Sequence, residues 1–132
     1  MVIKIDFNSD EALYIQLRNQ IIMGIATSQL AVGDSLPSVR QLADYVGINM
    51  HTVNKAYSVL KQEGYIKLDR RKGAVIAIDY DHVIASKQIL EMLQPVLAEA
   101  ICKRVDRNEV HDMVDAIFDS FTCEGQEEYE KY

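Results

Sequence analysis

The stretch from Leu36 to Gly64 constrains the fold of this chain more than any other part. It contains two segments with the apolar periodicity of helices, separated at Gly47 and closed by Gly64. Two helices joined by a tight turn that contains glycine form a helix-turn-helix. We therefore expect one helix over residues 38–46 and a second over residues 50–63.

The two expected helices each have an apolar face. Ser38 fits either the N-cap or the first turn of the first helix, and Asn49 is the natural N-cap of the second. Gly47 stands where a residue with positive φ is needed between them. The apolar face of the first helix comprises Val39, Leu42, Ala43 and Val46. In the second helix it comprises Val53, Ala56, Tyr57 and Leu60, so that His51, Asn54, Lys55, Ser58 and Lys61 project to the other side.

A β-hairpin is predicted directly after the second helix. Apolar and polar residues alternate over residues 65–68, and residues 74–78 form a second apolar strand. The basic turn from Asp69 to Gly73 separates the strands. A helix-turn-helix followed by a hairpin is a winged helix, the architecture of many DNA-binding domains.

An amphipathic helix is expected before this motif, over residues 11–27. Its apolar stripe recurs at a spacing of four residues, at Leu13, Leu17, Ile21 and Ile25. Asn8, Ser9 or Asp10 can cap it, because each side chain accepts hydrogen bonds from the first free N–H groups of a helix. Residues 2–7 have the composition of a short extended arm.

Two further helices are expected after residue 79. The first covers residues 82–105, and Pro95 should kink or divide it by removing a backbone hydrogen bond. Asp106 and Glu109 have capping-box spacing for a last helix over residues 107–121. The acidic tail over residues 123–132 has no periodicity, and we expect it to be disordered.

The last two helices carry more apolar surface than they can bury against each other. Self-association as a symmetric dimer would cover that surface. The expected interface residues are Ile89, Leu93, Val96, Leu97, Ala100, Val114, Ile117, Phe118 and Phe121. The predicted fold is thus mainly α with a small β-hairpin (α+β). A winged helix-turn-helix domain over residues 1–78 precedes a two-helix dimerisation domain over residues 79–122.

Charge is distributed unevenly along the chain. The net charge of −6 combines an excess of two basic residues over residues 1–78 with an excess of eight acidic residues over residues 79–132. Between Ser35 and Ile78, seven Lys/Arg face three Asp/Glu. Because phosphate binding depends on the local potential, the basic part suits a nucleic-acid partner despite the acidic total.

Several other functions find no support in the sequence. It has no apolar run long enough to span a membrane and no secretion signal, so we expect a cytoplasmic protein. Cys102 and Cys123 are expected to be reduced, although one disulfide between them is conceivable. The trio His111, Asp112 and Asp115 suits the exposed side of a helix better than a metal site. We expect no cofactor, no metal and no enzymatic acid–base pair.

The stretch from Gly33 to Ala43 resembles the signature of the GntR family of bacterial transcription regulators. The resemblance continues through Gly47-Ile48-Asn49, Thr52-Val53, Ala56-Tyr57, Leu60, Glu63-Gly64 and Gly73, and Leu13 to Leu17 is similar to that family's first helix. It covers about residues 10–78, in order and at the right spacing. The short C-terminal part is similar to the YtrA subfamily.

The resemblance implies which residues contact DNA. Arg40 matches an arginine that reaches a guanine edge or a phosphate, and Ser38 matches a phosphate contact. Lys72 and Gly73 match the wing tip that enters the minor groove. The full expected set is Ser38, Arg40, Asn49, His51, Thr52, Asn54, Lys55, Arg70, Arg71, Lys72 and Gly73. The chain departs from the family pattern at Met50 and at Gly73-Ala74-Val75. The base preference of other family members therefore cannot be assigned to this protein.

The expected function is therefore that of a homodimeric repressor on a partly palindromic operator in double-stranded DNA. The subfamily resemblance suggests a transporter operon or the protein's own operon as the target, with an unidentified small-molecule effector as a further expected partner. Two alternatives stay open. One is a winged helix that binds proteins, and the other is a regulator that senses a ligand or metal in its C-terminal helices.

Overall fold

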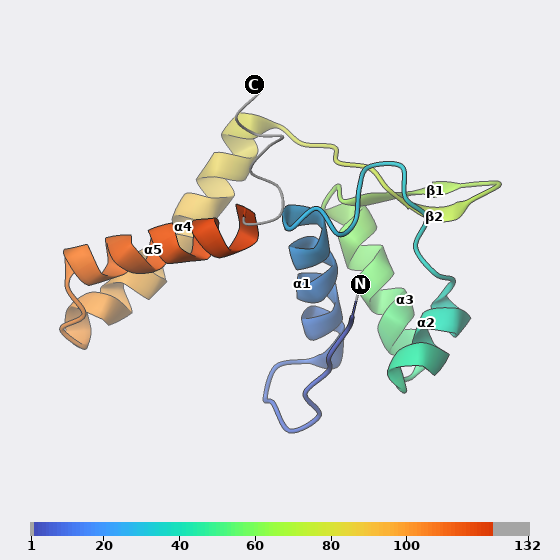
Figure 1. Ribbon diagram of the computed structural model, residues 1–132, viewed down its shortest axis with the longest axis horizontal. Coiled ribbons are helices and arrows are strands. Elements are labelled where there is room, and N and C mark those ends of the chain that lie inside the picture. Colours follow the sequence, from blue (N-terminus) through green and yellow to red (C-terminus); the bar gives the residue numbers. More distant parts are fainter. Residues whose placement is uncertain (1, 123–132) are drawn as a thin grey trace. The chain divides into compact units, whose positions relative to one another are not determined.

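The structure, a computed structural model, describes residues 2–122 and divides into two compact units after Asp79. The elements are α1 (Leu13–Ala26), α2 (Val39–Val46), α3 (Met50–Gln62), β1 (Ile66–Asp69), β2 (Gly73–Ile76), α4 (His82–Cys102) and α5 (Arg107–Thr122) (Figure 1). The predicted fold class is confirmed: a winged helix-turn-helix followed by C-terminal helices. The expected disorder of residues 123–132 concerns a segment outside the described residues.

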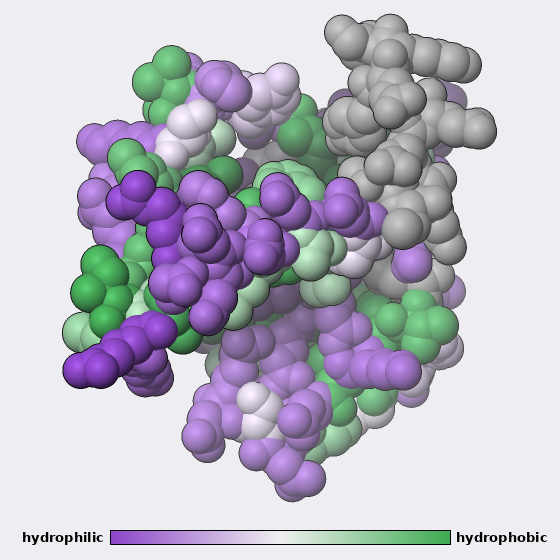
Figure 2. Space-filling model, turned by 60° about the vertical axis from the view of Figure 1, so that its left-hand side comes forward, coloured by the Kyte–Doolittle hydropathy of each residue, from purple (hydrophilic) through white to green (hydrophobic). Residues whose placement is uncertain are grey.

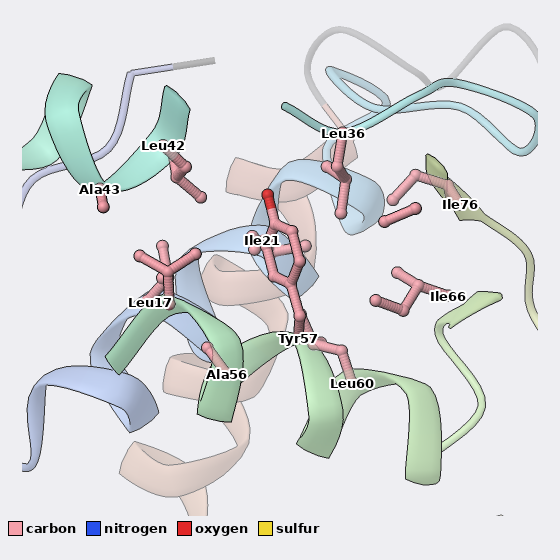
Figure 3. Packing of buried hydrophobic residues seen from close by; sticks show 12 residues of the cluster. Leu17, Ile21, Leu36, Leu42, Ala43, Ala56, Tyr57, Leu60, Ile66 and Ile76 are labelled. Atoms are coloured by element: carbon pink, nitrogen blue, oxygen red, sulfur yellow. The ribbon is translucent and has the colours of Figure 1, made fainter. Parts of the chain in front are cut away.

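One apolar core holds the first unit together. Helices α1 and α3 lie side by side and α2 packs on α3 (Figure 1). Side chains from these helices and from the hairpin converge between them (Figure 3), and Leu17, Val53 and Leu60 have no exposed surface. Tyr57 belongs to this core as predicted, and its hydroxyl donates a hydrogen bond of 2.7 Å to the carbonyl oxygen of Pro37. The core therefore fixes the angle at which α3 presents its outer face.

The start of α1 differs from the prediction. The helix begins at Leu13 rather than at residue 11, and its N-cap, Ala12, has no capping side chain. The expected caps were wrong: Ser9 instead accepts a hydrogen bond of 3.1 Å from the N–H of Glu11 in the preceding turn. The carbonyl of Glu11 accepts a hydrogen bond of 2.9 Å from the Gln16 side chain, so a side chain takes the place of a helical N–H as its partner.

The N-terminal arm is held by two glutamines of α1. The Gln16 amide accepts from the N–H of Asp6 at 2.9 Å and donates to its carbonyl at 3.0 Å. The Gln20 amide makes the same pair of hydrogen bonds with the backbone of Lys4. Because both donors and acceptors of alternate arm residues are satisfied, the amides replace a β-strand partner. Ile3 and Ile5 are thereby placed against the core.

Glycines end α2 and α3 as predicted. Gly47 caps α2 with φ of 79°, and Gly64 follows α3 with φ of 86°. At the end of α3, Tyr65 donates to the carbonyl of Leu60 at 2.9 Å and Gly64 donates to that of Lys61 at 3.2 Å, which is a Schellman motif. A Cβ at Gly64 would also collide with the carbonyl oxygen of Asp79.

The wing contains a third pairing segment that the sequence analysis missed. Strands β1 and β2 are antiparallel, with Ile66 opposite Ile76 and Asp69 opposite Gly73. On the other edge of β2, Leu36 donates to the carbonyl of Ala74 and Ile76 donates to that of Asp34. The stretch before α2 therefore covers the second edge of β2.

Helix α4 is continuous through Pro95, so of the two expected effects of Pro95, a kink or a division, the division was wrong. Asp81 caps its start by accepting from the N–H groups of Val83 and Ile84. The helix ends at Cys102 rather than at residue 105, because Arg104 adopts a left-handed φ of 58°. Its neighbour Val105 then donates to the carbonyl of Ala100 at 2.9 Å and closes the turn.

The second unit has no buried core of its own. The Asp106 carboxylate accepts from the N–H of Glu109 at 2.9 Å, which confirms Asp106 as the cap of α5. No residue described between Tyr80 and Phe121 is buried. On the face seen in Figure 2, hydrophobic residues lie at the surface between hydrophilic ones. Within the described part of the chain, no helix is long and apolar enough to cross a membrane.

Candidate nucleic-acid interface

The start of α2 is closed by a complete capping box. The Ser38 hydroxyl accepts from the N–H of Gln41 at 3.1 Å, and the Gln41 side chain accepts from the N–H of Ser38 at 3.0 Å. Ser38 is thus the N-cap and not a first-turn residue. Arg40, the second residue of the helix, is exposed. The cap fixes the backbone that carries Arg40 and leaves its guanidinium accessible to a partner.

The outer face of α3 is polar, as predicted. Its side chains His51, Asn54, Lys55, Ser58 and Lys61 are exposed, whereas Thr52 is half-buried. The carboxamide oxygen of Asn49 accepts from the N–H of His51 at 2.7 Å, so this side chain caps the helix. The first turn of α3 therefore presents His51 and Asn54 from a rigid helix end.

Lys55 makes a contact that the sequence analysis did not foresee. Its Nζ atom lies 4.1 Å from the centre of the Tyr14 ring on α1, the geometry of a cation–π interaction. Lys55 remains exposed, so its charge also stays available to a phosphate. The family motif places both residues, but only the packing of α1 on α3 brings them together.

A shallow depression of about 510 Å³ lies at the start of α3. Its lining consists of Val39, Asn49, Met50, His51 and Asn54. Three of these are predicted DNA-binding residues, and the structure adds the apolar pair Val39 and Met50. The sequence analysis did not foresee this depression.

The wing tip is organised around Asp69. The Asp69 carboxylate accepts hydrogen bonds from the N–H groups of Arg71 at 2.7 Å and Lys72 at 3.0 Å. These bonds lower the pKa of Asp69 below its usual range, because they favour the charged form. Gly73, which pairs with Asp69 where the turn ends, has a left-handed φ of 74° that a glycine adopts without a Cβ penalty. The side chains of the tip, Arg70, Arg71 and Lys72, are exposed.

The candidate DNA-binding residues all belong to the first unit. They come from α2, from α3 and from the tip of the wing. Within residues 2–122, the ion pair that the structure contains joins Arg18 to Glu63 at 2.7 Å. Arg40 and the basic wing residues are therefore not neutralised by carboxylates in ion pairs there. Together they form an exposed cationic surface suited to a polyanion.

The predicted dimer residues lie on α4 and α5, in the second unit. Leu93 is 43% exposed and Val114 is 41% exposed, and Ala100 and Phe121 are half-buried. The remaining members, Ile89, Val96, Leu97, Ile117 and Phe118, are exposed. The structure thus places apolar side chains of both helices at the surface, and no residue described in this unit covers them completely.

Other candidate sites are not assembled in the described residues. His111, Asp112 and Asp115 are exposed on α5, and no group of three or more potential metal ligands comes together in residues 2–122. Cys102 is a free, exposed thiol, and Cys123 lies outside the described residues, so the expected redox state is not tested.

The chain has clear relatives among known proteins. Residues 13–76 match the family described as "Bacterial regulatory proteins, gntR family". The chain is 30% identical to the "HTH-type transcriptional repressor YtrA" of Bacillus subtilis, over 88% of this chain and 92% of the relative. It is 34% identical to the B. subtilis "Uncharacterized HTH-type transcriptional regulator YhcF", where the match spans 59% of the relative.

Solved structures share the same fold. "YtrA from Sulfolobus acidocaldarius, a GntR-family transcription factor" is 40% identical with a TM-score of 0.59, covering 70% of this chain and 98% of that chain. A structure described as "Transcriptional Antiterminator from Listeria monocytogenes EGD-e" has a TM-score of 0.83 at 23% identity and covers 92% of both chains. At that identity the second likeness concerns the fold alone.

Proposed function

The chain belongs to the gntR family of bacterial regulatory proteins, and from that premise we propose that it is a homodimeric repressor of a partly palindromic operator. The family consists of DNA-binding transcription regulators and not of enzymes. The exposed basic surface formed by α2, α3 and the wing carries the proposal.

Sequence choice comes, in this proposal, from the start of α2 and the first turns of α3. Arg40 is exposed next to a capped helix start, and His51 and Asn54 are exposed on α3. An arginine can make two hydrogen bonds to a guanine edge, and asparagine can do the same with adenine. Helix α3 lies in the major groove, because winged-helix readers place their second motif helix there.

Affinity comes mainly from phosphate contacts. Ser38, Lys55, Arg70, Arg71 and Lys72 supply these contacts in our proposal, and the last three form the exposed tip of the wing. Each neutralised phosphate releases condensed counterions. The logarithm of the binding constant should therefore fall linearly with the logarithm of the salt concentration. The acidic excess after residue 79 does not oppose this, because the basic surface is local.

In our proposal, two copies of the chain associate through α4 and α5, and this dimer binds the operator. A pair of helices without a buried core gains stability when a second copy covers its apolar faces. A symmetric dimer would then set two winged helices at the spacing of two half-sites. An effector that changed the angle between the two copies would change the distance between their wings, which would then no longer match the two half-sites. The target operon that we propose is the protein's own, or a transporter operon as the subfamily resemblance implies.

The DNA-reading role is tested by replacing Arg40. The full-length protein is first used to select preferred duplexes from a random pool, and its own upstream region is footprinted. Arg40→Ala should then weaken binding by roughly 1–3 kcal/mol and flatten base preference at one position in each half-site. Arg107→Ala, which removes the same charge from α5, serves as the matched control and should leave the footprint unchanged. Unaltered affinity and base preference in Arg40→Ala would refute the assignment.

The interface is tested by placing a charge on α4. Leu93→Asp should give monomers in sedimentation experiments, because a carboxylate cannot be buried unpaired in an apolar interface. Ala98→Asp puts the same charge on the opposite side of the helix and should remain dimeric. If Leu93→Asp also remained dimeric, the copies would have to associate elsewhere.

A further inference from the structure

We propose that the depression at the start of α3 receives the 5-methyl group of a thymine, and that Met50 is the residue that selects for it. The inference rests on the proposed function, because it concerns the same DNA-reading surface. It adds a specificity-determining residue that reads an apolar group, beside residues that read by charge and hydrogen bonding.

The depression is formed where two helices begin. Val39 is the first residue of α2 and Met50 is the first residue of α3, and both line the same hollow. Val39 is half-buried, whereas Met50 is 44% exposed. The capping hydrogen bonds of Ser38 and Asn49 order both helix starts, which carry the two apolar side chains.

Polar groups surround this apolar pair. His51 and Asn54 line the same depression and are exposed. A base edge that enters here would meet hydrogen-bonding groups at its polar atoms and an apolar floor beside them. In the major groove the thymine methyl is the apolar group that distinguishes base edges, and it pairs with apolar side chains. The mixture of groups therefore fits the edge of a thymine better than that of an unmethylated cytosine.

Methionine is well suited to this contact. Its side chain is unbranched and polarisable, so it can fill an irregular space around a methyl group. Met50 is also one of the two places where this chain departs from the family pattern, so the contact would be a property of this chain rather than of that pattern.

The test removes only the methyl group. After duplexes have been selected with the full-length protein, each thymine of the preferred half-site is replaced in turn by deoxyuridine, which pairs identically but lacks the 5-methyl group. Burial of one methyl group predicts that one replacement per half-site weakens binding about threefold to fivefold. The other replacements should have smaller effects.

Variants then assign the effect to the depression. In Met50→Ala the penalty for that deoxyuridine should fall to less than about twofold, whereas Met50→Leu, which stays apolar, should retain it. Met23→Ala removes another exposed methionine, on α1 outside the depression, and should leave the penalty unchanged. Circular dichroism of each variant confirms that it is folded.

Two outcomes would overturn the inference. One is that no replacement changes the affinity of the unaltered protein by as much as about twofold, a measurement that needs no variant. The other is that the full penalty persists in Met50→Ala. If no duplex is enriched from the random pool at low salt, the proposed function fails instead, so the two failures are distinguishable.

Discussion

The two units of this protein solve the burial of apolar side chains in opposite ways. The first unit encloses a continuous core in which Leu17, Ile21 and Leu60 have no exposed surface. The second unit consists of two helices on which Leu93 and Val96 remain 43% and 55% exposed. The first unit has a buried core of its own, whereas no residue described between Tyr80 and Phe121 is buried.

The candidate DNA-binding residues lie in the first unit, whereas the residues of the proposed dimer interface lie in the second. A domain with its own core can hold α3, the wing and the depression in fixed positions without a partner. If two copies associate through α4 and α5 as we propose, that association should depend on protein concentration.

The largest effect is expected in the core of the first unit. Leu60→Ala should lower the free energy of unfolding by about 3–5 kcal/mol, because it leaves a cavity among closely packed side chains. Urea unfolding followed by tyrosine fluorescence measures this, since Tyr57 lies in the core. The matched change Leu97→Ala in α4 should leave that transition in place and instead raise the dimer dissociation constant. Equal effects on the transition would break the distinction between the units.

A smaller effect is expected at the end of α3. Gly64→Ala should lower the free energy of unfolding. A Cβ on a left-handed residue costs about 1–2 kcal/mol, and the contact of this Cβ with the Asp79 carbonyl should add to that cost. Gly47→Ala is the control, since a Cβ at Gly47 meets no atom within 4 Å and carries the backbone cost alone. Thermal unfolding of both variants measures the difference. If the free energy of unfolding fell by the same amount in both variants, the close approach of Asp79 would contribute nothing to the cost of the Cβ.

The turn between α4 and α5 should be open to improvement. Arg104 has a left-handed φ of 58°, so Arg104→Gly should stabilise the second unit by about 0.5–1 kcal/mol. Lys103→Gly, at a residue with an ordinary φ of −95°, should be destabilising instead. Helix unfolding by circular dichroism at fixed protein concentration measures both. A stabilised Lys103→Gly would show that chain flexibility, rather than strain, limits this turn.

The smallest effect concerns the wing tip and pH. The pKa of Asp69 is lowered in the folded protein by hydrogen bonds from the N–H groups of Arg71 and Lys72. A lowered pKa means that the stabilisation is complete above the pKa of the unfolded chain and is lost as the pH falls through the folded value. The amide protons of Arg71 and Lys72 should therefore exchange faster relative to intrinsic rates at acid pH. In Asp69→Asn this additional acid dependence should be absent.

Much of the first unit could be predicted from the sequence. Helix positions, the turn at Gly47 and the role of Tyr57 follow from periodicity and from local backbone chemistry. The candidate site rests instead on the family resemblance, in which Arg40, His51 and the wing tip match motif positions, and the structure leaves all of them exposed. The effect of Pro95 could not be predicted, since losing one backbone hydrogen bond does not by itself decide whether a helix ends.

What the sequence determined by itself was local: where segments are helical or extended, which faces are apolar and which motif they compose. The tertiary structure decided the contacts between distant segments. These include the hydrogen bonds between Gln16 and the N-terminal arm, the hydrogen bond from Leu36 to β2, and the depression that Val39 and Met50 both line. Such contacts depend on how elements pack in space, and a periodicity within one segment carries no information about its partner.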